Sequence, residues 1–308
     1  MKMVHRKKTA PWLRRSRGEK AFAVFNVLIM LLLIVITLLP MWHVFMGSLS
    51  DPVSLFLHHG VALYPIGGIS FEMYKNVITD NYFLTGYGNT IFYAVFGTLA
   101  TLIMCSMAAY TLCRRRMLNN ALTTILIIPM FFGGGLIPTY LVMRALGLLY
   151  TRTIMILMGS VSLYYIVVLR TAFSALPDGL IESAKIDGAN DFLVLLRIVL
   201  PLTKATIAVI ALFSIVGHWN SWYTAYIYLK DDSMMPLQIF LRRILLEKTA
   251  SQQELNNFMS GNSFYDSMMY VDAMQYTFAM VATLPILIAY PFVQRYFVKG
   301  VMIGAIKG

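Results

Sequence analysis

Long apolar runs constrain this chain more than any other feature of its sequence. Of its 308 residues, 58% are hydrophobic and only 13% are charged, which is far from the composition of a soluble globular domain. Apolar runs of about 20 residues are long enough to cross a bilayer as helices. The sequence therefore predicts an all-α, multi-pass integral membrane protein with six transmembrane helices, at about residues 22–46, 87–112, 121–143, 153–173, 203–228 and 275–298.

The distribution of basic residues predicts the orientation of these spans. Residues 1–20 carry eight Lys and Arg side chains, and a basic cluster beside an apolar run is typical of a cytoplasmic anchor. The first span is too long for a signal-peptide core, so we expect it to be retained. With the N-terminus inside, 18 of the 25 Lys and Arg residues fall on the cytoplasmic side and 7 outside. This excess predicts that both termini are cytoplasmic. The net charge of +11 is thus a sign of membrane orientation, and we expect no nucleic-acid partner.

One segment of mixed polarity separates the fourth and fifth spans on the predicted cytoplasmic side. Residues 176–201 read LPDGLIESAKIDGANDFLVLLRIVLP. Apolar residues at helical spacing predict a short helix after Pro177, and Gly188 predicts its end because glycine adopts the left-handed conformation. Asn190 or Asp191 can cap a second short helix. The sequence therefore predicts a helix, a glycine turn and a second helix outside the bilayer.

This segment resembles the EAA loop of binding-protein-dependent ABC importer permeases. The matching residues are Glu182, Ser183, Ala184, Gly188, Ile198, Leu200 and Pro201, and Ser183 stands where the first alanine usually stands. The IDGA sequence from Ile186 to Ala189 is similar to the carbohydrate-uptake branch of the family, of the oligosaccharide and maltose type. The sequence MFFGGGLIPTYL in the third span and the C-terminal ending from Gln294 are similar to that branch as well. An ordinary amphipathic cytoplasmic loop is the alternative interpretation.

The resemblance implies a type-I ABC importer permease fold for residues 21–308, in the cytoplasmic membrane. It also implies that residues 176–201 couple the permease to its ATPase, with contacts from Leu180, Glu182, Ser183, Ala184, Asp187, Gly188, Ala189 and Phe192. Glu182 would pair with a basic group of the ATPase, and apolar side chains would fill its docking groove. The implied partners are a second homologous permease, two copies of a P-loop ATPase, an extracellular or periplasmic solute-binding protein, a sugar substrate and the lipid bilayer.

Motifs for nucleotide binding and catalysis are missing from the sequence. The P-loop pattern is absent, so we expect ATP and magnesium on the partner ATPase and no cofactor on this chain. The five histidines and two cysteines show no metal-ligand spacing. We predict no catalytic residues and no metal site, and we expect that this chain is not an enzyme.

The end of the fifth span combines polar and aromatic residues in the sequence GHWNSWYTAYIY, residues 217–228. Imidazole, amide and aromatic groups suit sugars, which carry hydroxyl groups and apolar C–H faces. The candidate substrate-pathway residues are His218, Trp219, Asn220, Trp222 and Tyr223. An aromatic belt at the membrane interface is the alternative. Residues 230–273 predict an external loop, which either contacts a solute-binding protein or is a solvated loop with one amphipathic turn.

Three other functions stay open. An importer permease of the same class could carry a peptide or another non-sugar solute, because the sugar assignment rests on the resemblance. A stand-alone secondary transporter or channel is disfavoured, since the central turns of the spans carry no Asp, Glu, Lys or Arg. An integral-membrane enzyme is disfavoured by the missing acid–base set.

Overall fold

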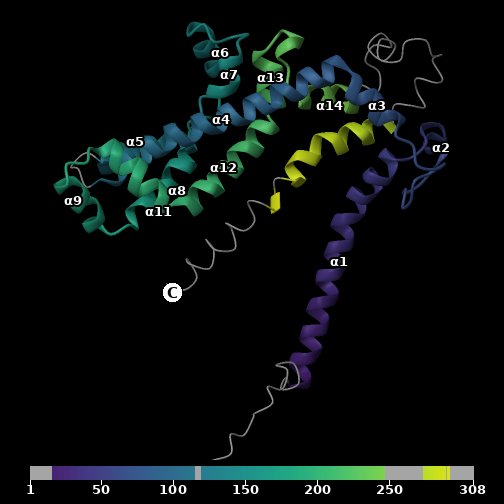
Figure 1. The fold of residues 1–308 in the computed structure, drawn as a ribbon, viewed down its shortest axis with the longest axis horizontal. Coiled ribbons are helices and arrows are strands. Elements are labelled where there is room, and N and C mark those ends of the chain that lie inside the picture. Colours follow the sequence, from purple (N-terminus) through teal and green to yellow (C-terminus); the bar gives the residue numbers. More distant parts are fainter. Residues whose placement is uncertain (1–15, 115–118, 247–272, 289, 292–308) are drawn as a thin grey trace, which may run out of the picture. The chain divides into compact units, whose positions relative to one another are not determined.

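The computed structural model describes residues 16–114, 119–246, 273–288 and 290–291, which fold almost entirely into helices (Figure 1). No strand forms within these ranges, and one isolated antiparallel bridge joins Ser50 to Ile69. The basic residues up to position 15 and the C-terminal ending from Gln294, to which the sequence assigned roles, lie outside the described residues. The chain divides into two compact units, Met1–Met73 with Met268–Thr277, and Tyr74–Ser267 with Phe278–Gly308.

The first unit is dominated by one long helix, α1 (Arg17–Ser48). Its start is fixed by a capping box, in which Ser16 accepts from the Glu19 N–H while the Glu19 carboxylate accepts from the Ser16 N–H. The most apolar stretch of α1 buries none of its residues inside the structure. A helix of this length and hydropathy, left uncovered by the described part of the chain, is suited to a lipid or protein environment. The short helix α2 (Pro52–Leu57) follows in the same unit.

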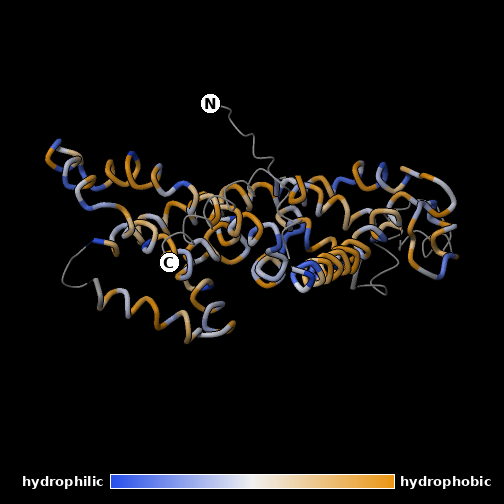
Figure 2. The backbone as a smooth tube through the Cα atoms, turned by 90° about the horizontal axis from the view of Figure 1, so that it is seen from below, coloured by the Kyte–Doolittle hydropathy of each residue, from blue (hydrophilic) through white to orange (hydrophobic). Residues whose placement is uncertain are grey.

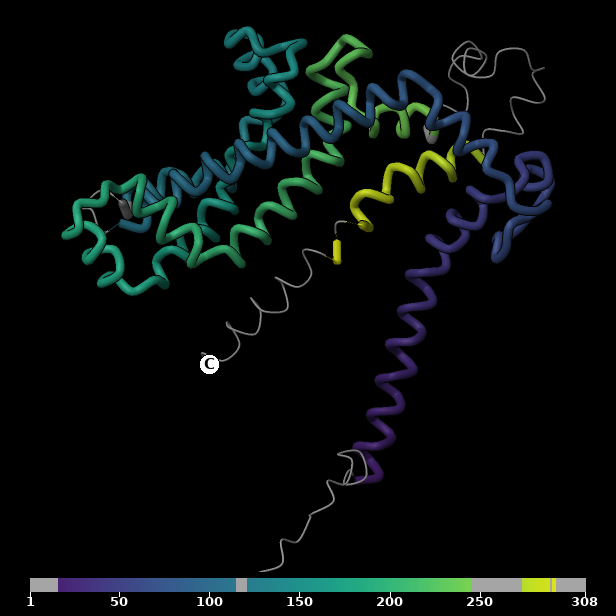
Figure 3. The backbone as a smooth tube through the Cα atoms, viewed as in Figure 1, coloured from purple at the N-terminus to yellow at the C-terminus, as the bar shows by residue number. Residues whose placement is uncertain are grey.

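The second unit is built around α4 (Asn81–Cys113), which follows the short helix α3 (Glu72–Thr79). Helices α8 (Leu163–Ser174) and α12 (Lys204–Trp219) pack along α4, as Figure 3 shows for its blue and green segments. Close packing of α12 depends on a glycine, because a Cβ at Gly97 would lie 2.5 Å from the ring of His218. Any larger residue at this position would therefore push the two helices apart.

Three of the predicted spans are broken into two helices each. The break expected in the third span is confirmed: α5 (Asn119–Phe131) and α6 (Leu136–Ala145) meet at 116° across the glycine run. The fourth span, expected as one segment, is divided into α7 (Arg152–Leu157) and α8. Gly159 causes this break, since its φ of +88° is incompatible with a continuous right-handed helix.

The fifth span also ends in a break, and the segment after it is more ordered than a plain loop. Helix α12 stops at Trp219, and α13 (Trp222–Tyr228) starts after Asn220 and Ser221. Within the predicted external loop 230–273, a 3₁₀ turn at Asp232–Met234 leads into α14 (Leu237–Leu246). The last described helix is Ala273–Ile288.

Length and composition bear out the membrane character of the chain. Among the described residues, α1 and α4 are long and apolar enough to cross a bilayer, and up to four such segments exist if each bent helix pair counts as one span. Figure 2 shows that apolar residues predominate along the helices, whereas hydrophilic stretches gather at helix ends and turns. The fold class predicted from the sequence is therefore confirmed as helical and membrane-compatible.

Candidate functional site

The segment 176–201 folds as two short helices separated by a glycine turn. Helix α9 (Asp178–Ile186) starts after Pro177, and α10 (Asp191–Val194) starts after Asn190. Gly188 has a φ of +84°, in the left-handed region predicted for it. Of the two candidate caps, Asn190 is the one used, because its Oδ1 accepts from the Leu193 N–H at 2.8 Å. The predicted local structure of this segment is confirmed.

One face of the segment is buried against the end of the second unit. Its buried side chains are Ile181, Val194, Leu195 and Val199. They pack in one cluster with residues of α4, α8 and α12 that include Tyr110, Phe173 and Ile210. Ala184 and Ala189 are partly buried against the same cluster. Two of the residues predicted to contact a partner therefore face the interior of this chain.

The opposite face is exposed and apolar. Leu180 and Phe192 are exposed, and Ile186 is 86% exposed. Glu182 is exposed as well, as is Ser183, whose hydroxyl donates back to the Gly179 carbonyl at 2.8 Å. Asp187 and Gly188 are also at the surface. Exposed apolar side chains next to the acidic Glu182 and Asp187 are what a protein docking surface needs, and the apolar ones are costly if left in water.

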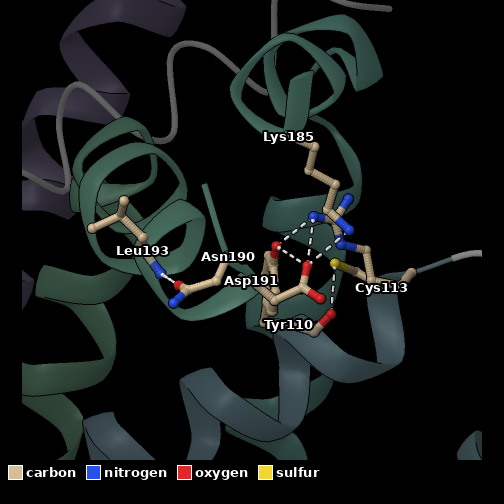
Figure 4. A network of polar contacts seen from close by, with 7 residues as sticks. Tyr110, Cys113, Lys185, Asn190, Asp191 and Leu193 are labelled. Carbon is tan, nitrogen blue, oxygen red and sulfur yellow. Dashed lines mark hydrogen bonds and ion pairs between the residues drawn. The ribbon is translucent and has the colours of Figure 1, made fainter. Parts of the chain in front are cut away.

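A polar network ties the segment to the end of α4 (Figure 4). The Oδ1 atom of Asp191 accepts from Lys185 Nζ at 3.0 Å and from the Tyr110 hydroxyl at 3.2 Å, and it lies 3.5 Å from an Arg114 nitrogen. Arg114 also donates to the Tyr110 hydroxyl. The hydrogen bond from Lys185, more than any other contact, lowers the pKa of the Asp191 carboxyl.

Sequence reasoning treated Asp191 only as a possible helix cap and did not find this network. The four residues come from three separate segments, and no spacing rule joins a residue at position 110 to one at 191. The pair Lys185 and Asp191 spans the glycine turn, so it closes the gap between α9 and α10. The network adds charge to the apolar contacts that hold the segment to the end of α4.

The chain leaves this segment through a sharp corner. Residues 195–199 form one π-helical turn, in which the Leu200 N–H bonds to the Leu195 carbonyl. Pro201 follows directly and has no N–H to continue an ordinary helical ladder. The run Asp191–Leu202 then meets α12 at 88°. The second half of the segment therefore lies across the axis of α12 rather than along it.

The candidate substrate-pathway residues divide into two groups. His218 and Trp219 are buried. The His218 ring lies against Gly97, and the Trp219 indole N–H donates to the Ala282 carbonyl at 3.1 Å. Both side chains therefore pack between helices of this chain.

The second group lies at the surface after the end of α12. Asn220 and Tyr223 are exposed, and Trp222 is partly exposed. The Arg242 guanidinium stacks on Trp222 and on Tyr226, with its carbon 4.8 Å and 4.7 Å from the two ring centroids. Arg242 lies in the predicted external loop 230–273, and its four-residue spacing from Gln238 on the short amphipathic helix α14 is the sequence signal that could have identified it.

Metal-binding groups do not come together in the part of the chain that the structure describes. No cluster of three or more His, Cys, Asp or Glu side chains lies there. Cys105 and Cys113 are both free thiols.

Comparisons with known proteins agree on one family. The family model for the binding-protein-dependent transport system inner membrane component matches residues 106–303. Protein LplC of Bacillus subtilis (strain 168) is 35% identical over 299 residues, which cover 96% of this chain and 98% of that protein. The polygalacturonan/rhamnogalacturonan transport system permease protein YtcP of the same organism is 33% identical over 289 residues, with 92% and 99% covered.

Solved structures share the fold. A chain in the crystal structure of a bacterial ABC transporter involved in the import of the acidic polysaccharide alginate superposes with a TM-score of 0.84 at 29% identity, covering 92% of this chain and 99% of that one. A second alginate transporter structure, in complex with an alginate pentasaccharide-bound periplasmic protein, contains a chain with a TM-score of 0.59 at 15% identity. It covers 90% of this chain and 96% of the other, and at that identity it supports the fold alone.

Proposed function

This chain belongs to the family of binding-protein-dependent transport system inner membrane components, and we propose that it forms half of an ATP-driven import pathway for a sugar or oligosaccharide. The relatives named for polygalacturonan, rhamnogalacturonan and alginate support a carbohydrate over a peptide. The chain is a membrane protein and a component of a transporter. In this proposal ATP and magnesium bind to separate ATPase subunits.

The two-faced construction of residues 176–201 carries the proposal. Its inner face is packed into the core formed by α4, α8 and α12, while its outer face leaves Leu180, Ile186 and Phe192 exposed. The ATPase would bind the outer face. When it closes on ATP, the segment would move with it, and the packed inner face would move the spans. Glu182 would pair with a basic group of the ATPase at the edge of this contact.

Six spans with cytoplasmic termini remain our proposal for the topology. The broken pairs α5–α6 and α7–α8 each fill one predicted span. Such breaks are compatible with a span, because irregular backbone at membrane depth is tolerated where protein covers it or where it lines a cavity. The excess of basic residues on one side supports this orientation. It also puts residues 176–201 in the cytoplasm, where an ATPase can reach them.

A second permease is part of the proposed assembly. One chain supplies one coupling segment, whereas an ATPase dimer offers two docking sites. We therefore propose a second, homologous permease, two ATPase copies and an external solute-binding protein. The periplasmic protein in the alginate transporter complex supports the last of these partners by analogy.

Purification of the tagged chain from gently solubilised membranes tests the proposal. We expect a P-loop ATPase and a second permease to co-purify. Gly188→Asp should lose the ATPase while the chain stays in the membrane, because a side chain at a φ of +84° strains the turn by about 1–2 kcal/mol. Gly179→Asp is the matched control, since it adds the same charge in the first turn of α9 without a positive φ. Recovery of the chain alone, with uptake that needs no ATP, would contradict the proposal.

A further inference from the structure

Two neighbouring helices bring four side chains together on one surface. Trp222 and Tyr226 lie four residues apart on α13, and Gln238 and Arg242 lie four residues apart on α14, so each pair shares one face of its helix. The Arg242 guanidinium carbon is 4.8 Å from the Trp222 ring centroid and 4.7 Å from that of Tyr226. We call these four side chains the aromatic–arginine surface.

The rings of this surface remain open to a ligand. Tyr226 is 60% exposed and Trp222 is 36% exposed, even with the guanidinium stacked on them. An amide pair lies at the edge of the surface, where Gln238 Nε2 donates to Asn220 Oδ1 at 3.4 Å. Flat rings that remain accessible beside amide groups are the elements that recognise the C–H faces and hydroxyl groups of a sugar.

The charge of Arg242 distinguishes this surface from a site for a neutral sugar. The adjacent Arg243 points to a carboxylate and pairs with Asp232 at 3.0 Å. Arg242 has no such ion pair within the described residues, and its contacts there are the two aromatic rings. Ring faces leave the in-plane N–H donors of a guanidinium unused, and those donors match a carboxylate in a bidentate fashion.

We propose that the aromatic–arginine surface binds an acidic oligosaccharide, with Arg242 holding the carboxylate of a uronate unit. Trp222 and Tyr226 lie against the sugar ring, and the amides of Gln238 and Asn220 bond its hydroxyl groups. This inference rests on the proposed function and narrows it to one chemical class of sugar. It places the predicted sugar contact of the fifth span at its exposed end, beyond the buried His218 and Trp219.

Direct binding to the assembled importer tests the inference. The complex of this chain with its co-purifying partners is placed in nanodiscs without the external binding protein. Saturation-transfer NMR titrations then compare trigalacturonic acid with its neutral trimethyl ester. These two probes differ only in the carboxylates. We expect the acid to bind at least about tenfold more tightly, which is the contribution of a charge-assisted bidentate contact. Equal binding of the two probes by the wild-type complex would overturn the inference.

Two variants locate the preference. Arg242→Gln should remove the preference for the acid while leaving the affinity for the ester within about twofold. Arg243→Gln changes the neighbouring arginine on the same helix, which is already paired with Asp232, and should keep the full preference. If Arg242→Gln still prefers the acid, or if Arg243→Gln loses the preference to the same extent, the preference does not come from Arg242 and the proposed role of Arg242 is refuted.

The same complex, reconstituted in proteoliposomes together with its external binding protein, separates this inference from the proposed function, because uptake needs a closed compartment. ATP-dependent uptake of the neutral ester without preference for the acid would overturn the acidic-sugar site and leave the importer assignment standing. A purified complex without ATPase would overturn the importer assignment itself.

Discussion

Replacing Asp191 with asparagine should loosen the hold of residues 176–201 on the end of α4. Asparagine keeps the shape of the side chain and removes its charge, so the contacts to Lys185 and Arg114 lose their ionic part. Asp191 and Lys185 are 47% and 46% exposed, so solvent screening keeps this pair near the low end of 0.2–1 kcal/mol typical of surface ion pairs. Arg114 is less exposed, so its contact with Asp191 is screened less by solvent. The hydrogen bond from the Tyr110 hydroxyl also weakens, because its acceptor is no longer charged. We expect a total loss of about 1 kcal/mol, or roughly fivefold in the opening equilibrium of the segment.

Hydrogen exchange on the assembled importer measures this loss directly. Amides of α10 should exchange about fivefold faster in Asp191→Asn, because exchange from a locally opened state follows the free energy of that opening. Transport per ATP hydrolysed should fall in the same variant while the partners remain bound. Lys185→Gln is the graded control, since it removes one contact and leaves those from Tyr110 and Arg114. Unchanged exchange and unchanged coupling in Asp191→Asn would refute the mechanical role of the network.

The pH dependence of this effect follows from the pKa of Asp191. The folded chain lowers that pKa below its unfolded value of about 3.9, chiefly through the hydrogen bond from Lys185. A group of this kind stabilises the fold fully above the unfolded pKa, and the stabilisation disappears as pH falls through the folded pKa. The difference between wild type and Asp191→Asn should therefore stay constant from pH 5.5 to pH 8. A difference that changes across this range would assign the effect to another group.

Three further predictions address the packing of α12 and the docking face. Gly97→Ala should lower the midpoint of thermal unfolding in detergent and cost about 1–3 kcal/mol of stability, because the new Cβ would lie 2.5 Å from the His218 ring. Gly88→Ala is the control and should leave the midpoint unchanged, because the space around Gly88 is open. Trp219→Phe should cost about 1 kcal/mol in the same assay, since the hydrogen bond from the buried indole N–H to the Ala282 carbonyl is lost. Glu182→Ala should uncouple ATP hydrolysis from uptake without lowering the amount of protein in the membrane, and normal uptake by this variant would sink the pairing assigned to Glu182.

Local rules account for most of what could be predicted from the sequence. The turn at Gly188 and the cap at Asn190 are decided within a few residues by backbone sterics and one side-chain hydrogen bond, so spacing alone was sufficient. Hydropathy likewise predicts where apolar helices run. The break at Gly159 was missed because a single glycine inside an apolar run is compatible with a continuous helix, and its φ of +88° depends on tertiary packing.

Burial of individual faces could not be predicted, because it depends on which helices become neighbours. His218 and Asn220 are two residues apart, yet one is buried against Gly97 and the other is exposed after the end of α12. The stacking of Arg242 on Trp222 joins residues 20 positions apart across a turn and a second helix. Long-range pairs of this kind leave no periodic signal in a single sequence.

The corner after residues 176–201 determines how a push on that segment would travel. Thr203 holds the corner with two bonds to the Val199 carbonyl, from its N–H at 3.0 Å and from its hydroxyl at 2.7 Å. On the other side of the corner the Thr203 carbonyl accepts from the Ile207 N–H at 3.1 Å, so Thr203 joins the segment directly to α12 without a loop between them. The inner face of the segment adds buried contacts from Ile181 and Val194 to α4 and α8. Force applied to the exposed face would therefore tilt α4, α8 and α12 together rather than unwind the segment, which is the motion that a mechanically driven pathway requires.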